Sequence, residues 1–455
     1  MKRLLSALFN KKGLSGTVLG FITLLAPSLV LADELNSGDT AWMLTATVLV
    51  LMMTIPGLSL FYAGMVRSKN VLSVLMQCFA ICCMVTVIWV VYGYSMAFDT
   101  TGMEAGVVNL NSIVGGLGNT FLQGISVDSI SGSIPESVFA TFQLTFAIIT
   151  PALIVGAFAE RMKFSTMMVF MALWVTICYF PMVHMVWAGD GGLLWDWGVL
   201  DFAGGTVVHI NAGIAAVAAA LIIGKRRNAS HSTEPHNVPF VVLGAALLWF
   251  GWFGFNAGSA LSSGGGAVNA FVTTNSAAAM AAITWVALSY FHTGKASVVG
   301  AAIGAVAGLV AITPAAGFVG LWPASDGFLN AFPALIIGAM SSVLGFYAIR
   351  LLSRFSSFDD TLDVFAVHGV GGMWGALATG IFAVAAVGGT AGLIEGEGAQ
   401  LWRQLVAILA TIGWTFVMTS VILIVIKYTM GLTVSEDAEE QGLDIAEHGE
   451  AAYTN

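Results

Sequence analysis

The sequence has few charged residues: only 9% of its 455 residues are Asp, Glu, Lys or Arg, whereas 58% are hydrophobic. A soluble globular domain has about 25% charged residues, so this composition excludes an ordinary cytosolic enzyme. It also excludes a disordered chain, which combines few apolar residues with much charge. The formal net charge of −9 argues against a nucleic-acid binder. The remaining class is a polytopic membrane protein.

Cysteine is also scarce. The four cysteines lie inside apolar runs, and neither a CxxC pair nor a histidine-rich tract accompanies them. A structural zinc site is therefore not expected, and neither is any other metal or cofactor. We interpret the cysteines as small buried hydrophobic residues. They are Cys78, Cys82, Cys83 and Cys178.

Residues 1–32 have the pattern of a cleavable signal peptide. Four basic residues lie among the first twelve, an apolar stretch covers 14–31, and small residues precede Asp33. The alternative is a retained first helix, but the stretch is short and Pro27 interrupts it. We expect cleavage after Ala32, with residue 33 outside the cytoplasm.

Uncharged intervals predict eleven transmembrane helices and an all-α fold. A span needs about 20 apolar residues to cross roughly 30 Å of hydrocarbon. The interval 235–294 is long enough for two helices, with a turn at 262–266. The other predicted helices occupy 40–66, 70–98, 137–159, 164–189, 202–224, 296–325, 327–349, 364–394 and 404–426.

The charged residues predict which way these helices run. Short cytoplasmic loops collect Lys and Arg. If the mature chain starts outside, each predicted inner segment contains Lys or Arg, whereas the predicted outer segments contain only Arg403 and several acidic residues. We therefore expect a multi-pass membrane domain over 33–427 and a cytoplasmic carboxyl-terminal tail over 428–455.

The spans divide into two groups of five, over 40–224 and 239–394, followed by a last helix over 404–427. An odd number of spans in each group means that the second group starts on the opposite side of the membrane. This arrangement is typical of the inverted repeats from which many transporters are built, with the pathway at the repeat interface.

The last helix of each group carries an acidic residue at its amino end and a histidine farther in. Asp201 precedes His209, and Asp363 precedes His368. At a rise of about 1.5 Å per residue, His209 lies about 12 Å from the outer end and His368 about 8 Å from the inner end. A lone membrane histidine is often a packing group, but the matching positions favour a functional pair. Both carboxylates are explained as helix caps, and Asp201 is also placed to stabilise a nearby cation.

No predicted span has an Asp, Glu, Lys or Arg near its centre. A pump that relays protons through buried carboxylates is therefore disfavoured. A pathway through these helices would be apolar, with imidazoles as its main polar lining. Gly300, Gly304 and Gly308 recur every four residues, which indicates tight helix packing.

Three ordered motifs carry a resemblance to a known family. They are Asp201-Phe-Ala-Gly-Gly-Thr-Val-Val-His209-Ile-Asn, Trp252-Phe-Gly-Phe255-Asn-Ala-Gly-Ser259-Ala and Asp363-Val-Phe-Ala-Val-His368-Gly, and the segment 442–449 is also typical. The sequence resembles the ammonium transporter (Amt) family of the Amt/Rh superfamily over nearly the whole mature chain. Motifs of this length and order are a strong signal.

The resemblance implies a homotrimer in a bacterial inner membrane that serves nitrogen uptake, with one pathway per subunit. The substrate would be ammonium or ammonia, with methylammonium as a further candidate. The segment between Trp187 and Asp201 is slightly longer than in the shortest members of the family. The site residues that the resemblance implies are Trp187, Ser259 and Phe142 for recruitment, Phe146 and Phe255 for a gate, His209, His368 and Trp252 for the pore, and Asp201 as a supporting carboxylate.

These residue types suit ammonium, a small cation with four N–H donors. A tryptophan face attracts a cation by about 0.5–2 kcal/mol, and a serine oxygen accepts a hydrogen bond. A dry channel excludes an unpaired ion, so ammonium passes only by losing a proton and crossing as ammonia, which potassium is unable to do. We hypothesise deprotonation near the phenylalanines or at His209, with the proton following along the histidine pair. Without the resemblance, each aromatic residue would be interpreted as packing or lipid-facing.

The acidic tail by itself indicates a solvated cytoplasmic end. The resemblance implies that it packs under neighbouring subunits and responds to PII-type signal proteins. Two alternatives to an ammonium transporter remain: an Rh-like electroneutral ammonia channel, and an ammonium sensor that acts through a partner. An enzyme is disfavoured because no nucleophile–base pair or phosphate-binding loop is evident.

Overall fold

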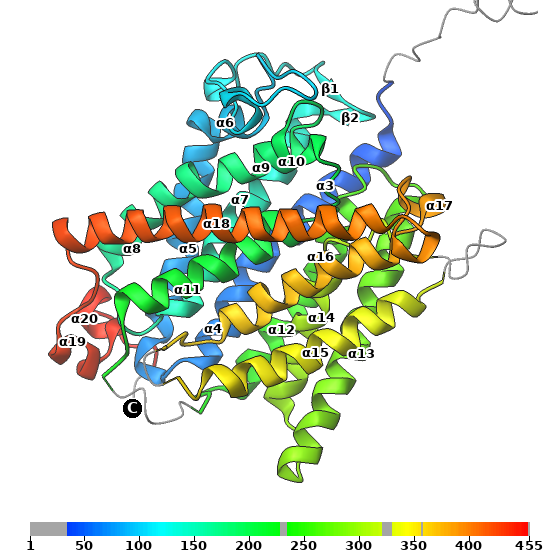
Figure 1. Ribbon diagram of the computed structural model, residues 1–455. Helices are drawn as coiled ribbons and strands as arrows, with labels where there is room; N and C mark the ends of the chain where they lie inside the picture. The colour runs from blue at the N-terminus through cyan, green and yellow to red at the C-terminus, as the bar shows by residue number, and fades with distance from the viewer. Residues whose placement is uncertain (1–33, 228–233, 321–329, 356–357, 454–455) are drawn as a thin grey trace, which may run out of the picture.

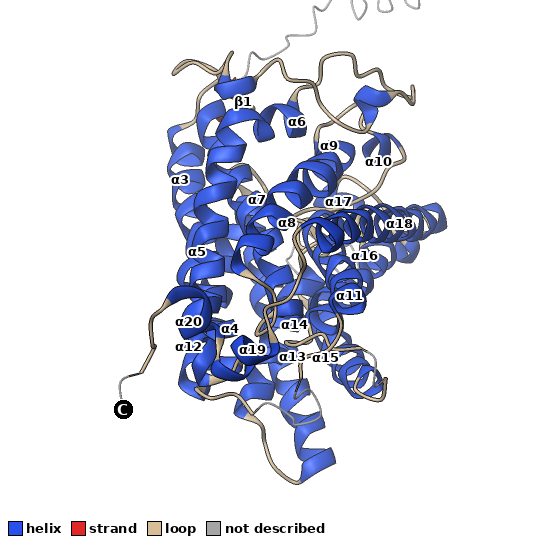
Figure 2. Ribbon diagram, turned by 90° about the vertical axis from the view of Figure 1, so that its left-hand side faces the viewer, coloured by secondary structure: helices blue, strands red, loops and turns tan. Residues whose placement is uncertain are grey.

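The computed structural model describes residues 34–227, 234–320, 330–355 and 358–453. The predicted signal peptide over 1–32 lies outside this part of the chain. Within it, ten helices are long and apolar enough to cross a membrane, and one further apolar helix is shorter. They pack side by side as a helical bundle (Figures 1 and 2). The prediction of a polytopic all-α membrane protein is confirmed.

Many spans join an α-helix to a π-helical turn. Those of the first half are α3 (Ser37–Met52) with the turn Met53–Leu58 and α4 (Ser59–Met65), α5 (Val71–Ile88) with Trp89–Gly93 and α6 (Tyr94–Phe98), α7 (Glu136–Phe158), α8 (Phe164–Trp174) with Val175–Tyr179 and α9 (Phe180–Trp187), and the turn Gly205–Ile210 with α11 (Asn211–Ile223). Every backbone group must find an internal partner in lipid, and helices satisfy most of their own backbone groups, which is the physical reason for this architecture.

The second half and the tail follow the same plan. Their elements are α12 (Val238–Trp252) with the turn Phe253–Ala257, α13 (Gly265–Thr293), α14 (Val298–Ile312), α15 (Phe332–Leu352), the turn Phe365–Val370 with α16 (Gly371–Phe382), α18 (Gly398–Thr429), α19 (Glu436–Gln441) and α20 (Leu443–His448). Two short helices, α10 (Leu193–Asp196) and α17 (Ala385–Gly388), and the hairpin of β1 (Ile130–Ser131) and β2 (Ile134–Pro135) lie in loops.

The predicted turn between two spans is confirmed, whereas two predicted helices end well before their expected bounds. The turn at 262–266 separates the span that ends at Ala257 from α13, as predicted. The helix predicted over 296–325 instead ends at Ile312, because Pro314 has no backbone N–H with which to continue the helical hydrogen bonding. At about 1.5 Å per residue, α14 is about 22 Å long. The span predicted over 364–394 ends at Phe382, and α17 is a separate turn of helix.

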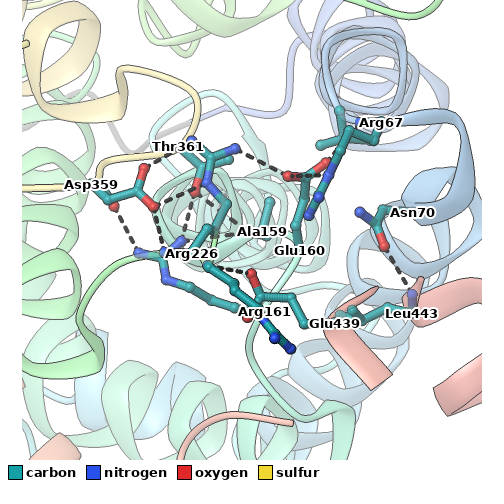
Figure 3. Close-up of polar contacts among 12 residues, drawn as sticks. Arg67, Asn70, Ala159, Glu160, Arg161, Arg226, Asp359, Thr361, Glu439 and Leu443 are labelled. Carbon is teal, nitrogen blue, oxygen red and sulfur yellow. Dashed lines mark hydrogen bonds and ion pairs between the residues drawn. The ribbon is translucent and has the colours of Figure 1, made fainter. Parts of the chain in front are cut away.

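Contacts sort the loops into two ends of the bundle. At one end the tail docks, and the Leu443 amide donates to Asn70 Oδ1 over 2.8 Å. At the other end, the Ser263 amide donates to Asp39 Oδ1 over 2.8 Å. The basic loops lie at the tail end, as the charge pattern predicts (Figure 3). That this end faces the cytoplasm stays a prediction, and we refer to it as the predicted cytoplasmic end.

The tail is more ordered than its acidic composition indicates. Asp444 Oδ1 accepts the Ser73 amide over 2.8 Å, at the start of α5, and Glu447 Oε2 accepts the Phe164 amide over 2.9 Å, at the start of α8. Carboxylates near helix amino ends satisfy free N–H groups and meet the positive end of the helix dipole. The tail therefore caps two membrane helices.

The glycine pattern of α14 has the predicted role. A Cβ at Gly304 would lie 2.5 Å from the Cβ of Trp285 on α13, so only glycine permits this close approach. The interpretation of the cysteines is confirmed for Cys78 and Cys178, which are buried. It is wrong for Cys83, a residue of α5 whose side chain is exposed on the surface of the bundle.

Candidate functional site

The two predicted histidines meet in the middle of the bundle. His209 Nδ1 lies 3.2 Å from His368 Nδ1, and the rings are nearly parallel, with centroids 5.3 Å apart. Both side chains are buried. Each lies in a π-helical turn, Gly205–Ile210 for one and Phe365–Val370 for the other, and such turns are frequent at functional sites. One histidine can donate its Nδ1 hydrogen to the other only if the second is the opposite tautomer.

A glycine brings the two histidine helices together. A Cβ at Gly213, one turn after His209, would lie 2.3 Å from the backbone nitrogen of Gly369, the residue after His368. Real Cβ atoms do not approach backbone so closely, so this position requires glycine. The short distance between the imidazoles therefore depends on a backbone contact as well as on the histidines themselves.

The histidine pair lines an enclosed apolar cavity. Within the part of the chain that the structure describes, Nε2 of His209 has no hydrogen-bond partner. The imidazoles are thus the main polar side chains of an apolar compartment, as predicted from the absence of central charges. The cavity is lined by Leu58, Phe61, Ile149, Leu153, Val208, His209, Leu248, Trp252, Phe255, Val306 and His368.

A stack of aromatic rings closes this cavity on its predicted outer side. The rings of Phe146 and Phe255 are 4.4 Å apart, and Phe255 is 6.0 Å from the His209 ring. Phe142 contacts Phe146 at 5.0 Å. All three phenylalanines are almost fully buried. The ring pair predicted as a gate therefore fills the space directly above the first histidine.

Trp187 and Ser259 border the outer side of this stack. The Trp187 ring is 5.7 Å from Phe146, and its Nε1–H donates to the backbone carbonyl of Asp201 over 2.9 Å. The Ser259 hydroxyl donates to the carbonyl of Phe255 over 2.8 Å. Because its hydrogen is used in this way, the hydroxyl oxygen keeps its lone pairs as acceptors. Both side chains are only partly buried.

Asp201 is committed to the start of the helix that carries His209. Its Oδ1 accepts the amides of Gly204 and Gly205 over 2.8 and 2.6 Å. Its Oδ2 accepts the amides of Thr206 and Val207, and also the Thr206 hydroxyl. The predicted cap is therefore present. Since both carboxylate oxygens are occupied by local donors, Asp201 acts on the site by holding this turn in place.

The cap predicted at Asp363 is wrong, because Asp360 has that role. Asp360 Oδ2 accepts the amide of Phe365, the first residue of the next turn, over 2.7 Å. Asp363 has a positive φ of 57° and lines a second cavity on the predicted cytoplasmic side, which shares His368 and Phe61 with the first. Burial, and then the charge of Asp360, raise the pKa of Asp363 to about 7.

Trp252 closes the wall of the first cavity. Its ring stacks on His209 at 5.5 Å, and its Nε1–H donates to the Thr313 hydroxyl over 2.8 Å. Sequence reasoning missed Thr313 and the aliphatic lining residues. The aliphatic residues carry no signal, because equivalent residues fill every span. Thr313 follows the end of α14, and only the arrangement of the helices shows what it binds.

Sequence reasoning also missed a buried charge cluster at the predicted cytoplasmic end (Figure 3). The guanidinium of Arg226 bonds Asp359 at 2.8 Å and Glu160 at 3.0 Å, and Arg67 bonds Glu160 at 3.0 Å. Burial opposes ionisation of Glu160, but Arg67 and Arg226 outweigh it and hold its pKa below the usual value. A signal was present, since acidic residues in basic inner segments break the charge pattern.

Comparisons with known proteins agree with this geometry. The family model described as Ammonium Transporter Family matches residues 41–453. The chain is 44% identical to an ammonium transporter of Bacillus subtilis over 92% of its length and 99% of that protein. It is 46% identical to an ammonium transporter of Aquifex aeolicus, over 96% and 98% of the two chains.

A solved structure shows the same fold. The crystal structure of Saccharomyces cerevisiae Mep2 superposes with a TM-score of 0.80 at 35% identity and covers 90% of each chain. The alignments cover almost the whole length of both bacterial relatives, and the histidine pair lies where the motifs predict. The chain therefore belongs to the ammonium transporter family and is a transporter of ammonium, not an enzyme.

Proposed function

We propose that the protein recruits the ammonium cation at Trp187 and Ser259, removes a proton near the phenylalanine stack, and passes neutral ammonia along the histidine pair. The arrangement of Trp187, Phe146, Phe255 and His209 carries this proposal, since consecutive members are in ring contact. A cation is thus attracted at one side of the stack and meets an apolar cavity at the other. Phe142 supports the stack from α7.

The cavity accounts for selection between ammonium and potassium. An isolated ion loses far more hydration free energy in an apolar compartment than two imidazoles return. Ammonia pays no such cost, and the unsatisfied Nε2 of His209 offers it a hydrogen-bond partner. Potassium has no neutral form, so it remains outside. Selection then depends on the proton and requires no difference in ion size.

The histidine pair supplies a route for the proton that ammonium leaves behind. The Nδ1 atoms are within hydrogen-bonding distance, so a proton can pass between the rings with little movement. Asp363 borders the next cavity on the predicted cytoplasmic side. Its raised pKa makes it a group that both binds and releases a proton near neutral pH. Net transport would then carry one charge per ammonium.

The test is the current across a supported membrane that carries the purified protein, after ammonium and potassium pulses. We expect an ammonium-selective current that falls at least about tenfold in His209→Ala and in His368→Ala. His292→Gln, which alters an exposed histidine at the end of α13, is the control and should keep the full current. Alkalinisation inside vesicles without any current would indicate the Rh-like electroneutral channel instead. Unchanged rate and selectivity in both alanine variants would reject the role of the pair.

We further propose that the protein is a homotrimer of the bacterial inner membrane that takes up nitrogen, with its tail in the cytoplasm and under PII-type control. The docking of α20 on α5 and α8 supports a regulatory tail, because a partner that displaces it would uncap both helices. Truncation before Glu436 should abolish binding of a PII-type protein in pull-down. Equal binding by the truncated chain would remove this part of the proposal.

A further inference from the structure

An open apolar groove is lined by residues of α11, α15 and α18 and of the segments next to them. These three helices lie on the face of the bundle that is turned toward the viewer in Figure 1. Its volume is about 410 Å³, which is within the range of small-molecule sites. It is separate from the two cavities of the transport pathway. Its lining residues are Ile214, Val217, Leu221, Leu352, Phe355, Phe358, Phe365, Ile412 and Phe416.

The groove borders a seam along which α11 contacts α18. The Thr415 hydroxyl on α18 donates to Asn211 Oδ1 on α11 over 2.8 Å, and farther along, the Lys427 ammonium donates to the carbonyl of Ile222. From Ile214 to Leu221, at a rise of about 1.5 Å per residue, the α11 wall is about 10 Å long. An extended hydrocarbon chain fits such a seam better than a compact ligand does.

Lipid-facing side chains form the rim of the groove. Leu221 is 52% exposed, Phe355 56% and Phe416 40%, which is unusual for large apolar residues unless an apolar phase covers them. The span that contains α11 crosses the membrane, so this phase is the bilayer. The groove lies towards the last turns of α11 and α15, which places it in the leaflet on the predicted cytoplasmic side.

Basic residues gather where the groove opens to the predicted cytoplasmic end. Lys225 follows α11, Arg354 precedes Phe355 of the lining, and Lys427 bonds Ile222 beside Leu221. All three are exposed, and among the described residues none of them belongs to an ion pair.

The acidic residues at this end of the groove do not neutralise these three cations. Asp359 is bound by the guanidinium of Arg226, and Asp360 accepts the amide of Phe365. Among the described residues, no acidic side chain lies within ion-pair distance of Lys225, Arg354 or Lys427, so the rim presents three cations that can meet a lipid headgroup.

We infer that this groove is a binding site for one anionic phospholipid, with an acyl chain along the α11–α18 seam and its phosphate at Lys225, Arg354 and Lys427. Basic pockets between transmembrane helices on the cytoplasmic side are a recurring form of lipid headgroup site. A zwitterionic lipid would fill the groove but would bring no net charge to the rim. A second copy of this chain would bring the same positive rim and be repelled.

The bound lipid would act on the helices of the transport pathway. The groove wall includes α11, which directly continues the turn that carries His209, and Phe365, which opens the turn that carries His368. An acyl chain wedged between them would stabilise their packing against α18. Binding should therefore raise the temperature of unfolding without touching the substrate.

The test uses full-length purified protein in vesicles that contain a phosphatidylglycerol probe with a photoactivatable acyl chain, and a matched phosphatidylcholine probe. We expect the phosphatidylglycerol probe to label the groove residues at least about fivefold more strongly. The combined variant Lys225→Gln, Arg354→Gln and Lys427→Gln should remove this preference. Lys295→Gln replaces an exposed cation in the loop between α13 and α14. It is the control variant and should keep the preference for the phosphatidylglycerol probe.

A second variant tests the acyl chain independently of charge. Val217→Trp fills the groove from α11 and leaves the basic rim intact, so labelling of Leu221 and Phe416 should be lost while the ammonium current is retained. Equal labelling by both probes would reduce the groove to ordinary lipid contact and overturn the inference. Cross-links between subunits at these residues, with no lipid labelling, would overturn it in favour of a protein interface.

Discussion

The histidine pair and the charge cluster at the predicted cytoplasmic end are both buried and polar, but they are built in opposite ways. In the cluster, Glu160 is bound by the guanidiniums of Arg67 and Arg226, and its Oε1 accepts the backbone amide of Arg67. In the histidine pair, the two rings share one contact, and Nε2 of His209 has no partner among the described residues.

The difference follows from what burial costs. An unpaired buried charge is strongly destabilising, so the residues that join the loops must be ionised and fully paired. A neutral imidazole with one unsatisfied nitrogen costs only about 1–3 kcal/mol. The pathway therefore keeps a weak, unused hydrogen-bonding site for its substrate, whereas in the cluster the carboxylates of Glu160 and Asp359 are held by guanidinium groups.

Breaking the charge cluster should have the largest effect. Glu160→Gln leaves buried guanidiniums short of a counter-charge, and the loss of stability should be about 3–5 kcal/mol. Glu436→Gln, in a pair whose carboxylate is 79% exposed, is the control and should cost about 0–1 kcal/mol. Thermal unfolding in detergent, followed by tryptophan fluorescence, measures both. Similar midpoints for the two variants would contradict the view that the cluster holds the loops together.

Separating the two helices that carry His209 and His368 should have the second-largest effect. Gly213→Ala places a methyl group against Gly369, which should cost about 1–3 kcal/mol and reduce the ammonium current. Gly413→Ala on α18 is the matched control, because a Cβ there meets open space and the better helix propensity should leave stability equal or higher. Unfolding midpoints and currents of the two variants test the contact. If they coincide, the glycine contact does not set the separation of the helices.

Replacing both histidines should separate stability from transport. The double variant His209→Leu and His368→Leu removes both partners of one contact, so no buried polar atom is newly left unpaired. We expect an unfolding midpoint within a few degrees of the native protein and an ammonium current at least about tenfold lower, equivalent to about 1.4 kcal/mol in the barrier. A full current in the stable variant would show that the imidazoles are only packing.

The smallest expected effect concerns Asp363. Its folded-state pKa of about 7 lies above the usual value of about 3.9, so folding favours the neutral form. The stability that the neutral carboxyl group of Asp363 contributes should be complete below about pH 4 and should be lost as the pH rises through 7.

Asparagine and alanine separate charge from backbone conformation at this position. Asp363→Asn should remove that pH dependence and tolerate the positive φ, whereas Asp363→Ala should cost about 1–2 kcal/mol through backbone strain. Unfolding midpoints between pH 5 and 8 measure both. An unchanged slope in the asparagine variant would contradict the raised pKa.

Much of the architecture could be predicted because the bilayer constrains it locally. Length, hydropathy and charge predict the number of apolar helices and the two groups of loops, since each helix must satisfy its own backbone in lipid. The histidine pair was also predictable, because His209 and His368 occupy matching positions in the two halves. Imidazoles among apolar residues are chemically distinct, so two of them stand out in the sequence.

Other features depend on contacts between distant segments. Leu58 and Val306 line the cavity, yet nothing in the sequence distinguishes them from aliphatic residues that face lipid. Asp360 rather than Asp363 caps the next turn because of where the chain bends before it. Composition and periodicity describe each helix alone, whereas the lining of a cavity depends on how neighbouring helices rotate and approach one another. That choice is made by close packing between helices far apart in the chain, and only the folded bundle contains it.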